Sequence, residues 1–225
     1  MTLEIRPVRA HEMAALAALN RAAYPDLIQD GVVFSEDQMR GQHALFPEGQ
    51  LVAVREGLLV GAIATFIPPR AFDPLALHTW MGITDAGTFS RHDPHGDTLY
   101  LADIYVDRAE WGSGVGRELY AALFALCRQL GLKNVVGGGR LYDYIDAAPE
   151  LAPAEYVAQV LRGERRDRVL LSQLRAGFTV RGLLPGYLHD GRSRHIATPI
   201  VWDNPGRQAL HPVVDLAPAH TSTGR

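Results

Sequence analysis

The chain has 225 residues, of which 47% are hydrophobic and 21% charged, and its formal net charge is −3 at pH 7. This composition suits one folded soluble domain and gives no support for binding to nucleic acid or to an anionic membrane surface. The N-terminus lacks a signal-peptide pattern, and the longest apolar run, residues 58–69, is shorter than the roughly 20 residues that span a bilayer. The single cysteine, Cys127, cannot form an internal disulfide, so we predict a cytoplasmic protein.

The first part of the chain predicts one strand and two helices. Residues 3–9 alternate between apolar and polar, and Pro7 favours an edge strand. Residues 11–27 carry apolar side chains along one helical face. Ser35 followed by Gln38 is a capping box, which predicts that a second helix begins there.

A hairpin follows, and after it a long segment without a regular pattern. Residues 50–55 and 58–66 are predicted strands joined by a tight turn. Residues 68–97 are rich in Pro, Gly, His and Asp, and loops of this length usually carry function or are disordered. The acidic and histidine side chains of residues 90–97 lack the helical spacing of metal ligands. We therefore expect no metal site here, and either a flexible rim of a binding pocket or a plain solvated loop.

The stretch from Leu99 to Leu130 is the most informative in the chain. Residues 99–106 have the composition of a strand, residues 111–116 read Trp-Gly-Ser-Gly-Val-Gly, and apolar residues then recur every three or four positions. The order is therefore strand, glycine-rich turn, helix. A helix N-terminus leaves N–H groups unpaired, and preceding glycines let a phosphate approach them. The turn is thus either an anion cradle or a tight turn that needs positive φ and binds nothing.

Two common phosphate-binding motifs do not fit this turn. A P-loop ends in Gly-Lys-Ser/Thr, and the chain contains no Lys-Ser or Lys-Thr pair. A dinucleotide fingerprint needs Gly-x-Gly-x-x-Gly, but counted from Gly112 the third glycine comes one place early, at Gly116, and Arg117 takes its position. A nucleotide-phosphate binder is therefore the weakest interpretation.

The stretch resembles the central motif of the GNAT-type N-acetyltransferase superfamily. Val106 stands at the family's strand position, Gly114 and Gly116 at its glycine positions, and Trp111 where Gln or Arg is usual. The resemblance implies that the turn holds the pyrophosphate of acetyl-CoA and that the strand edge holds its pantetheine arm. The implied cofactor-binding residues are Ile104, Tyr105, Val106, Trp111, Gly112, Ser113, Gly114, Val115, Gly116 and Arg117.

The last third predicts a strand at residues 134–139, a short helix at 153–163, a second helix at 169–177, and two strands near 180–184 and 194–202. The mostly basic run 162–168 is expected to be a solvated connection. Several motifs here are similar to GNAT domains that often precede a carbon–nitrogen hydrolase domain, and we expect a free-standing version. The domain should span residues 1–205, with an inserted helix at about 150–165. A polar tail, 206–225, should be disordered or packed on a partner. Separately, we consider a homodimer as the assembly of the chain.

The resemblance implies an α/β fold with a mixed, mostly antiparallel central sheet and helices on both faces. It also implies an enzyme that moves an acetyl group from acetyl-CoA to an amine of a small molecule, in preference to a peptide. The alternative is a non-catalytic acyl-CoA-binding or sensing domain. The departure at Trp111 and the lack of the family's usual acid favour this alternative, whereas an acidic residue on the strand argues against it.

That acidic residue is Asp103, the candidate base. A base helps because an alkyl amine is mostly protonated at neutral pH, and similar acetyltransferases carry acidic side chains at this place. The alternative is a structural Asp bonded to a neighbouring loop. Alternation predicts that Asp103 shares a face with Tyr105, and that Ala102, Ile104 and Val106 share the other unless a bulge intervenes. By resemblance, the donor to the developing oxyanion lies near residues 104–106.

The acid that the family usually employs is absent from this sequence. Many relatives use a Tyr four residues before the glycine that closes the last helix, and here Gln173 takes that position. Tyr142, Tyr144 and Tyr187 are the substitutes considered, with Tyr142 as the predicted catalytic residue. Each can equally be a packed aromatic residue, and a thiolate with a pKa near 8.5 is a leaving group that can depart without an acid.

Overall fold

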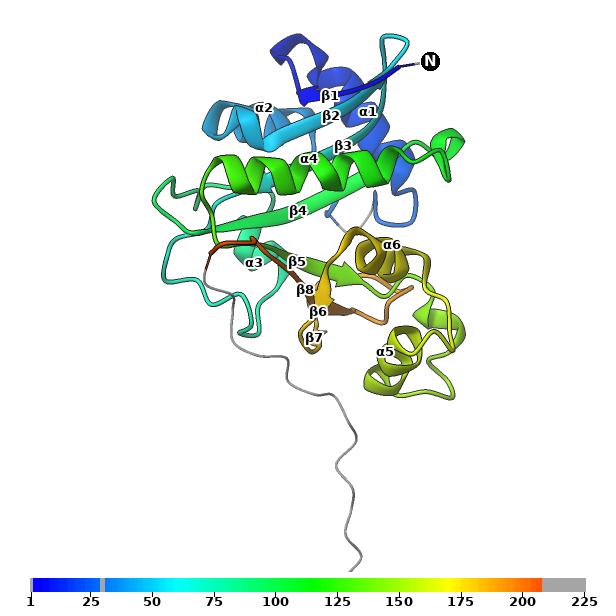
Figure 1. Ribbon diagram of the computed structural model, residues 1–225. Coiled ribbons are helices and arrows are strands. Elements are labelled where there is room, and N and C mark those ends of the chain that lie inside the picture. Colours follow the sequence, from blue (N-terminus) through cyan, green and yellow to red (C-terminus); the bar gives the residue numbers. More distant parts are fainter. Residues whose placement is uncertain (1, 29–30, 208–225) are drawn as a thin grey trace, which may run out of the picture.

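The computed structural model describes residues 2–28 and 31–207. Their core is one eight-stranded sheet in the order β1-β2-β3-β4-β5-β8-β6, with β7 paired to β8 (Figure 1). Only the β4–β5 pair is parallel, which confirms the predicted mixed, mostly antiparallel sheet. The strands are β1 (Leu3–Pro7), β2 (Gln50–Arg55), β3 (Leu58–Phe66), β4 (Thr98–Val106), β5 (Asn134–Arg140), β6 (Thr179–Val180), β7 (Leu184–Pro185) and β8 (Ile196–Asp203).

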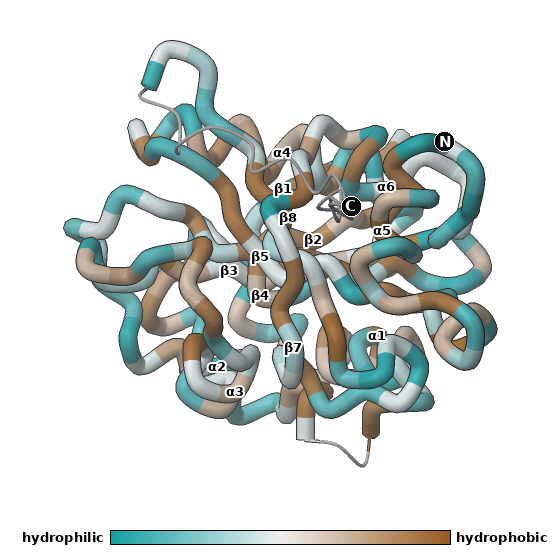
Figure 2. The backbone as a smooth tube through the Cα atoms, turned by 90° about the horizontal axis from the view of Figure 1, so that it is seen from below, coloured by the Kyte–Doolittle hydropathy of each residue, from teal (hydrophilic) through white to brown (hydrophobic). Residues whose placement is uncertain are grey.

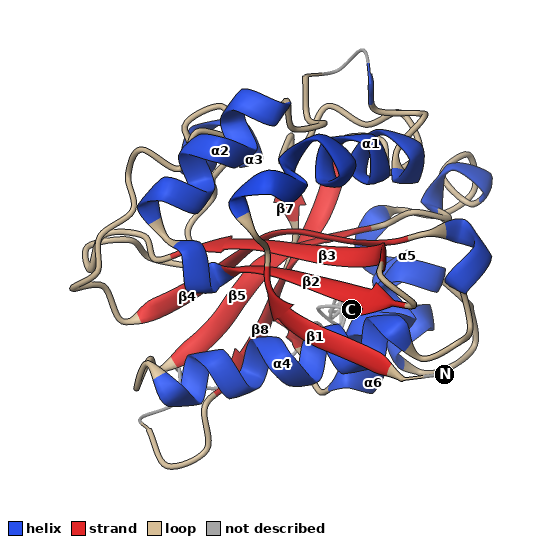
Figure 3. Cartoon of the chain, turned by 90° about the horizontal axis from the view of Figure 1, so that it is seen from above, coloured by secondary structure: helices blue, strands red, loops and turns tan. Residues whose placement is uncertain are grey.

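Helices cover both faces of the sheet, as predicted (Figure 3). One face carries α1 (Met13–Ala23), α2 (Glu36–Leu45) and α3 (Trp80–Thr84), and the other carries α4 (Val115–Gln129) and α6 (Arg168–Ala176). The short helix α5 (Pro153–Leu161) packs into the α4 side. Each face buries its own apolar cluster, and Figure 2 shows the hydrophobic residues running along the central strands while the outer loops are mostly hydrophilic. No helix of the described residues is long and apolar enough to cross a membrane.

Several local predictions are confirmed by the hydrogen bonds that define the elements. Ser35 Oγ accepts from the backbone N–H of Gln38, and the Gln38 side chain accepts from the N–H of Ser35, so the capping box forms. β2 and β3 form the predicted hairpin. Helix α6 ends at Gly177, whose φ of 108° is the left-handed conformation that favours glycine. Helix α1 ends at Ala23 rather than at residue 27, because Pro25 cannot continue it.

The prediction for residues 68–97 is wrong where it treats the segment as solvated. The segment contains α3, and the side chains of Trp80 and Phe89 are buried in the core on the α1 side of the sheet. These apolar residues follow no helical or strand period, so periodicity did not reveal them. Among the described residues, no group of three or more His, Cys, Asp or Glu side chains is placed to hold a metal ion.

The last third differs from the prediction at two places. The predicted strand near 180–184 is two short pairings, β6 and β7, separated by residues 181–183, which belong to no strand or helix. Asp167, in the run predicted to be solvated, is fully buried and caps α6 by accepting from the N–H groups of Val169 and Leu170. The tail beyond residue 207 lies outside the described residues.

The central feature of the sheet is the separation of β4 from β5. Their parallel pairing runs from Thr98–Asn134 to Leu101–Gly137 and then ends, although both strands continue. Opposite Ala64 and Thr65 the register of β4 shifts, which places Ala102 at a bulge. Two strands that pair at one end and part at the other leave an opening between them.

The bulge corrects one prediction about side-chain faces. Tyr105 packs in the cluster on the α1 side, and the Asp103 carboxylate accepts a hydrogen bond from Asn20 of α1, so both lie on that side as alternation predicts. Ile104 and Val106 pack in the opposite cluster, also as predicted. Ala102 packs on the α1 side rather than with Ile104 and Val106, because the extra residue at the bulge resets the alternation.

Candidate active site

A cavity of about 700 Å³ occupies the opening between β4 and β5. Its wall is formed by the outer half of β4, the glycine-rich turn, the first turn of α4, the end of β5, α6 and the loop before β8. Trp80 from the 68–97 segment also lines it, so that segment contributes to the rim of the cavity. The cavity joins the turn that could hold phosphates to the strand that carries Asp103.

In the glycine-rich turn, the backbone conformation requires glycine at two positions and does not require it at a third. Gly112 and Gly114 have φ of 81° and 92°, where a side chain would be strained. Gly116 lies in the first turn of α4 with ordinary helical φ, and a Cβ there would come no closer than 4.0 Å to another atom, Cγ2 of Val106. Neither conformation nor packing therefore requires glycine at residue 116, and the space beside it is open.

The outer half of β4 presents backbone groups to the cavity. The N–H of Asp107 donates to the carbonyl of Val60 on β3, so the alternate residues Ile104 and Val106 direct their backbone groups away from β3. Their carbonyls accept side-chain donors: Tyr24 Oη lies 2.8 Å from the carbonyl of Ile104, and Trp111 Nε1 lies 3.1 Å from that of Val106. The N–H of Ile104 interacts with the Asp103 carboxylate, whereas the N–H of Val106 is directed away from β3 at a residue that lines the cavity.

Asp103 lies partly buried in the cavity wall, bonded to two side chains of the first helix. Asn20 Nδ2 donates to it over 2.9 Å and Tyr24 Oη over 2.7 Å. Burial raises the pKa of Asp103 to about 6, although these hydrogen bonds, the N–H of Ile104 and the positive charge of Arg140 act to lower it. A carboxyl with a pKa near 6 is ionised at neutral pH and still accepts a proton readily, which suits a general base.

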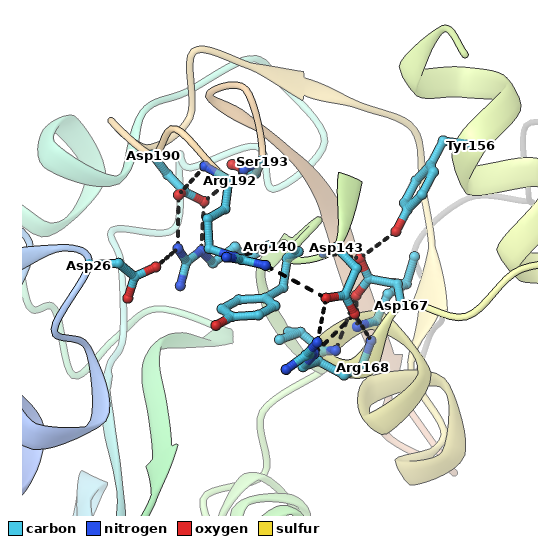
Figure 4. Close-up of polar contacts among 12 residues, drawn as sticks. Asp26, Arg140, Asp143, Tyr156, Asp167, Arg168, Asp190, Arg192 and Ser193 are labelled. Atoms are coloured by element: carbon cyan, nitrogen blue, oxygen red, sulfur yellow. Dashed lines mark hydrogen bonds and ion pairs between the residues drawn. The ribbon is translucent and has the colours of Figure 1, made fainter. Parts of the chain in front are cut away.

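Three arginines beside Tyr142, which lines the cavity, belong to an ion-pair network with Asp26, Asp143 and Asp190 (Figure 4). The guanidinium carbons of Arg140, Arg168 and Arg192 lie 4.9, 4.8 and 4.2 Å from the centre of the Tyr142 ring. Arg140 is held between Asp190 and Asp26 at 2.6 and 2.7 Å, and Asp143 pairs with Arg168. The described residues accept no hydrogen bond from the Tyr142 hydroxyl. The network fixes the ring and leaves its hydroxyl free at the cavity.

The other acid candidates have different positions. Tyr144 does not line the cavity, and its hydroxyl donates to the carbonyl of Leu151 over 2.8 Å. Tyr187 lines the cavity and is bonded to Tyr100. Gln173 lines it from α6, is almost fully buried, and its Oε1 has no hydrogen-bond partner in the described part of the chain. An unpaired buried acceptor carries an energetic cost, so a donor from outside the chain would be favourable at Gln173.

The structure gathers most of the predicted residues around this one cavity. Its lining includes both predicted catalytic residues, Asp103 and Tyr142, and the predicted cofactor-binding residues apart from Ser113. Ser113 instead donates its hydroxyl to the carbonyl of Glu110. Sequence reasoning missed Asn20, although an amide on the apolar face of a predicted helix was a usable signal. It also missed Tyr24 and Trp80, for which the sequence contains no such signal.

Comparison with known proteins agrees with this geometry. Residues 13–138 match the model of the Acetyltransferase (GNAT) family, and the chain belongs to that family, whose class of activity is acyl transfer. It is 32% identical over 203 residues to YkwB, an uncharacterized N-acetyltransferase of Bacillus subtilis (strain 168), covering 90% of this chain and 89% of that protein.

Other relatives differ in their described roles. The chain is 38% identical over 161 residues to YhcX, a probable hydrolase of Bacillus subtilis (strain 168); the match covers 71% of this chain and 31% of that protein. This match agrees in part with the predicted likeness to GNAT domains linked to a hydrolase. Among solved structures, a GphF GNAT-like decarboxylase in complex with isobutyryl-CoA has a TM-score of 0.74 and 26% identity, covering 89% of this chain and 98% of that one. YncA of Salmonella typhimurium, solved with acetyl-CoA, shares the fold at a TM-score of 0.59 and 19% identity, over 93% of this chain and 98% of that one.

Proposed function

We propose that the chain transfers an acetyl group from acetyl-CoA to the primary amine of a small molecule. The observation that carries this proposal is Gly116, a helical glycine that neither φ nor packing explains and that opens onto the cavity. Space kept free at a helix N-terminus, beside two glycines with positive φ, fits a phosphate group. Family membership and the names of YkwB and YncA support the choice of acyl-CoA.

The chain offers a consistent set of groups for acetyl-CoA, which would supply the activated acetyl group as a thioester. The backbone of residues 112–117 and the N-terminus of α4 would face the pyrophosphate. Arg175 on α6 lines the cavity and makes no hydrogen bond or ion pair within the described residues, so its charge is available to a phosphate. The N–H of Val106 would bind the pantetheine arm or the carbonyl oxygen of the acetyl group.

The surroundings of Asp103 favour a primary amine as the acceptor. An ammonium entering the cavity would find the Asp103 carboxylate beside the rings of Tyr24, Trp80 and Tyr187, which all line it. Asp103 would bind the ammonium and then take its proton, leaving the neutral amine as nucleophile. Leu27 and Val32 also line the cavity, which favours an acceptor with an apolar body over a peptide.

Two side chains can assist the leaving thiolate. Tyr142 presents a free hydroxyl at the cavity and can donate a proton or a hydrogen bond. The Gln173 amide has no acidic proton, so its role would be limited to hydrogen bonding with the ligand. Because a thiolate is a good leaving group, we expect the loss of either group to cost less than the loss of Asp103.

A second candidate function comes from the neighbour described as a decarboxylase. Its 26% identity and TM-score of 0.74 favour acyl-CoA decarboxylation as the competing reaction. A substrate for that reaction would bring a carboxylate into the cavity, where it would meet the carboxylate of Asp103, and like charges at close range repel. The position of Asp103 therefore favours amine acetylation.

The test uses the purified chain with acetyl-CoA and a panel of primary amines that includes phenethylamine, with malonyl-CoA in a parallel reaction. We expect amine-dependent release of CoA and an N-acetylated product detected by mass spectrometry. Binding of acetyl-CoA without product from any amine would support the alternative of a non-catalytic sensing domain. Release of CO₂ from malonyl-CoA without amine acetylation would favour the decarboxylase.

A further inference from the structure

Three side chains form a continuous hydrogen-bonded chain that begins at the cavity and leads away from it. Tyr187 Oη lies 2.8 Å from Tyr100 Oη, and Tyr100 Oη lies 2.9 Å from Nε2 of His78. Tyr187 lines the cavity, Tyr100 is fully buried and does not line it, and His78 is partly exposed on the 68–97 segment. None of these contacts is needed to bind the acyl-CoA or to form the base.

The partners at the ends give the chain a direction. His78 Nδ1 lies 2.8 Å from the carbonyl of Ala76, which can only accept, so Nδ1 carries the proton. Nε2 of a neutral His78 is then an acceptor, and Tyr100 must donate to it. The Tyr100 oxygen in turn accepts from the Tyr187 hydroxyl. Every O–H in the chain therefore points from the cavity toward His78.

The surroundings hold this chain in place. A Cβ at residue 138 would lie 2.2 Å from the Tyr187 ring, so glycine at Gly138 is what lets that ring lie against β5. The backbone of Trp80 donates to the carbonyl of Tyr187 over 2.7 Å. The His78 ring contacts Phe72, Tyr100 and Tyr187 edge-on.

Two carboxylates act on the ends of the chain. Burial lowers the pKa of His78, while the Ala76 carbonyl and the charge of Asp73 act against this. His78 is consequently neutral, and able to accept a proton, at neutral pH. At the cavity end burial raises the pKa of Tyr187, and the charge of Asp103 also raises it, so Tyr187 stays protonated and available as a donor.

Acetylation of an ammonium releases a proton that must leave the cavity. The C–N bond forms and the C–S bond breaks; of the two protons that the nitrogen loses, one ends on the thiolate and one goes to solvent. We propose that Tyr187, Tyr100 and His78 form a relay that carries this second proton from the cavity to solvent. The relay rests on the proposed function, because it serves a reaction that releases a proton.

In the relay, Tyr187 accepts the proton from the cavity as it gives its own to Tyr100, and Tyr100 gives its own to Nε2 of His78. His78 becomes the imidazolium and loses its proton to water, and rotation of the hydroxyls restores the starting arrangement. Asp103 lines the same cavity as Tyr187, and it is restored as a base once its proton has passed through the cavity to the relay. Tyr100 is a positioning residue by this account, since it touches neither substrate nor cofactor.

The variant Tyr100→Phe breaks the relay at its buried middle and keeps the aromatic packing. Tyr144→Phe is the matched control, since it also removes a buried tyrosine hydroxyl, one that donates to a carbonyl away from the cavity. With acetyl-CoA and phenethylamine, we expect Tyr100→Phe to lower kcat about tenfold and to leave KM for acetyl-CoA within about twofold. Adding imidazole, a small diffusible base, should restore part of the lost rate, whereas Tyr144→Phe should behave as wild type. An unchanged kcat, or a loss that imidazole does not relieve, would overturn the relay.

A second measurement does not depend on turnover. Nitrogen-15 NMR of His78 in the wild-type protein near neutral pH should show the tautomer protonated at Nδ1, with Nε2 as acceptor. Protonation at Nε2 would reverse the direction of the hydrogen bonds and overturn the relay, whether or not any amine is acetylated. Absence of product from every amine, by contrast, would count against the proposed function itself.

Discussion

Asn20 on α1 donates a hydrogen bond of 2.9 Å from its side-chain amide to the carboxylate of Asp103 on β4. The same amide accepts, through Oδ1, from the backbone N–H of Phe34, and Asn20 is fully buried. One side chain thus links the helix, the segment before α2 and the candidate base. Because Asn20 stabilises the charged form of Asp103 while burial opposes it, the pair sets the pH at which the base becomes available.

The variant Asp103→Asn should lower the rate of acetyl transfer about 100-fold or more, because it keeps the shape of the side chain and removes the base. Binding of acetyl-CoA should be nearly unchanged. The measurement is kcat with phenethylamine beside calorimetric titration with acetyl-CoA. Full activity per folded molecule would end the assignment of Asp103 as base and leave it a structural residue.

The same variant should change stability with a defined sign. The pKa of Asp103 is raised from 3.8 to about 6 in the folded protein, so ionisation penalises the fold as pH rises through this range. The free energy of unfolding of Asp103→Asn minus that of wild type should therefore be larger at about pH 8 than at about pH 4. The expected increase is on the order of 1–2 kcal/mol after screening by solvent. Urea denaturation at both pH values measures this difference. A gain in the opposite direction would contradict the raised pKa.

Replacing Asn20 with Asp keeps the acceptor for Phe34 and places a second carboxylate beside Asp103. Two carboxylates that share a site raise one pKa, so the acidic limb of the kcat/KM profile should move up by about one pH unit or more. Gln42→Glu is a control for the loss of a buried amide, since Gln42 donates to the carbonyl of Gly87 away from the cavity. If both variants give the wild-type profile, Asn20 does not tune the base.

Gly116→Ala should separate ligand binding from folding. Alanine at a helical glycine raises stability by up to about 1 kcal/mol, and here its Cβ meets no atom closer than 4.0 Å. The same Cβ would fill space assigned to the phosphates, so affinity for CoA should fall at least tenfold, about 1.4 kcal/mol. Thermal melting and titration with CoA on one preparation give both quantities. Raised stability with unchanged affinity for CoA would contradict the assignment of this space to the phosphates.

Cys127 should react slowly with thiol reagents in the folded protein. It is fully buried in α4, and burial raises the pKa of its thiol to about 12, so the reactive thiolate is scarce at neutral pH. Labelling with a maleimide should become fast only after denaturation. Rapid labelling accompanied by loss of activity would show that the thiol is exposed to the site.

The sequence predicted the parts of this protein that depend on local signals. The capping box at Ser35, the hairpin after residue 50 and the glycine at the end of α6 follow from short-range rules. The motif ending in Gly116 predicted residues that line the cavity. The surroundings of Asp103 could not be predicted, because the residues that contact it meet only in the fold. Asn20, Tyr24 and Asp103 come from two elements about 80 positions apart, and no spacing rule relates them.

The glycines of β5 show the same limit. Residues 137–139 are three consecutive glycines, and glycine inside a strand indicates that a ligand or another backbone approaches closely. At Gly137 the close neighbour is another backbone, at the carbonyl of Leu101. At Gly138 it is neither a backbone nor a ligand but the ring of Tyr187. The sequence could show that space was needed and could not show which atoms would use it.

The proposal of amine acetylation with Asp103 as base is tested most directly by the pH dependence of product formation. N-acetylated phenethylamine is measured by mass spectrometry from about pH 5 to pH 9, with saturating acetyl-CoA and the amine below its KM. Because a rate measured below the KM of the amine reports the enzyme before the amine binds, the rate for the wild-type protein should rise through a pKa near 6. Asp103→Asn should lose this rise together with most of the rate. Product formed at the same rate by both proteins across this range would contradict the account.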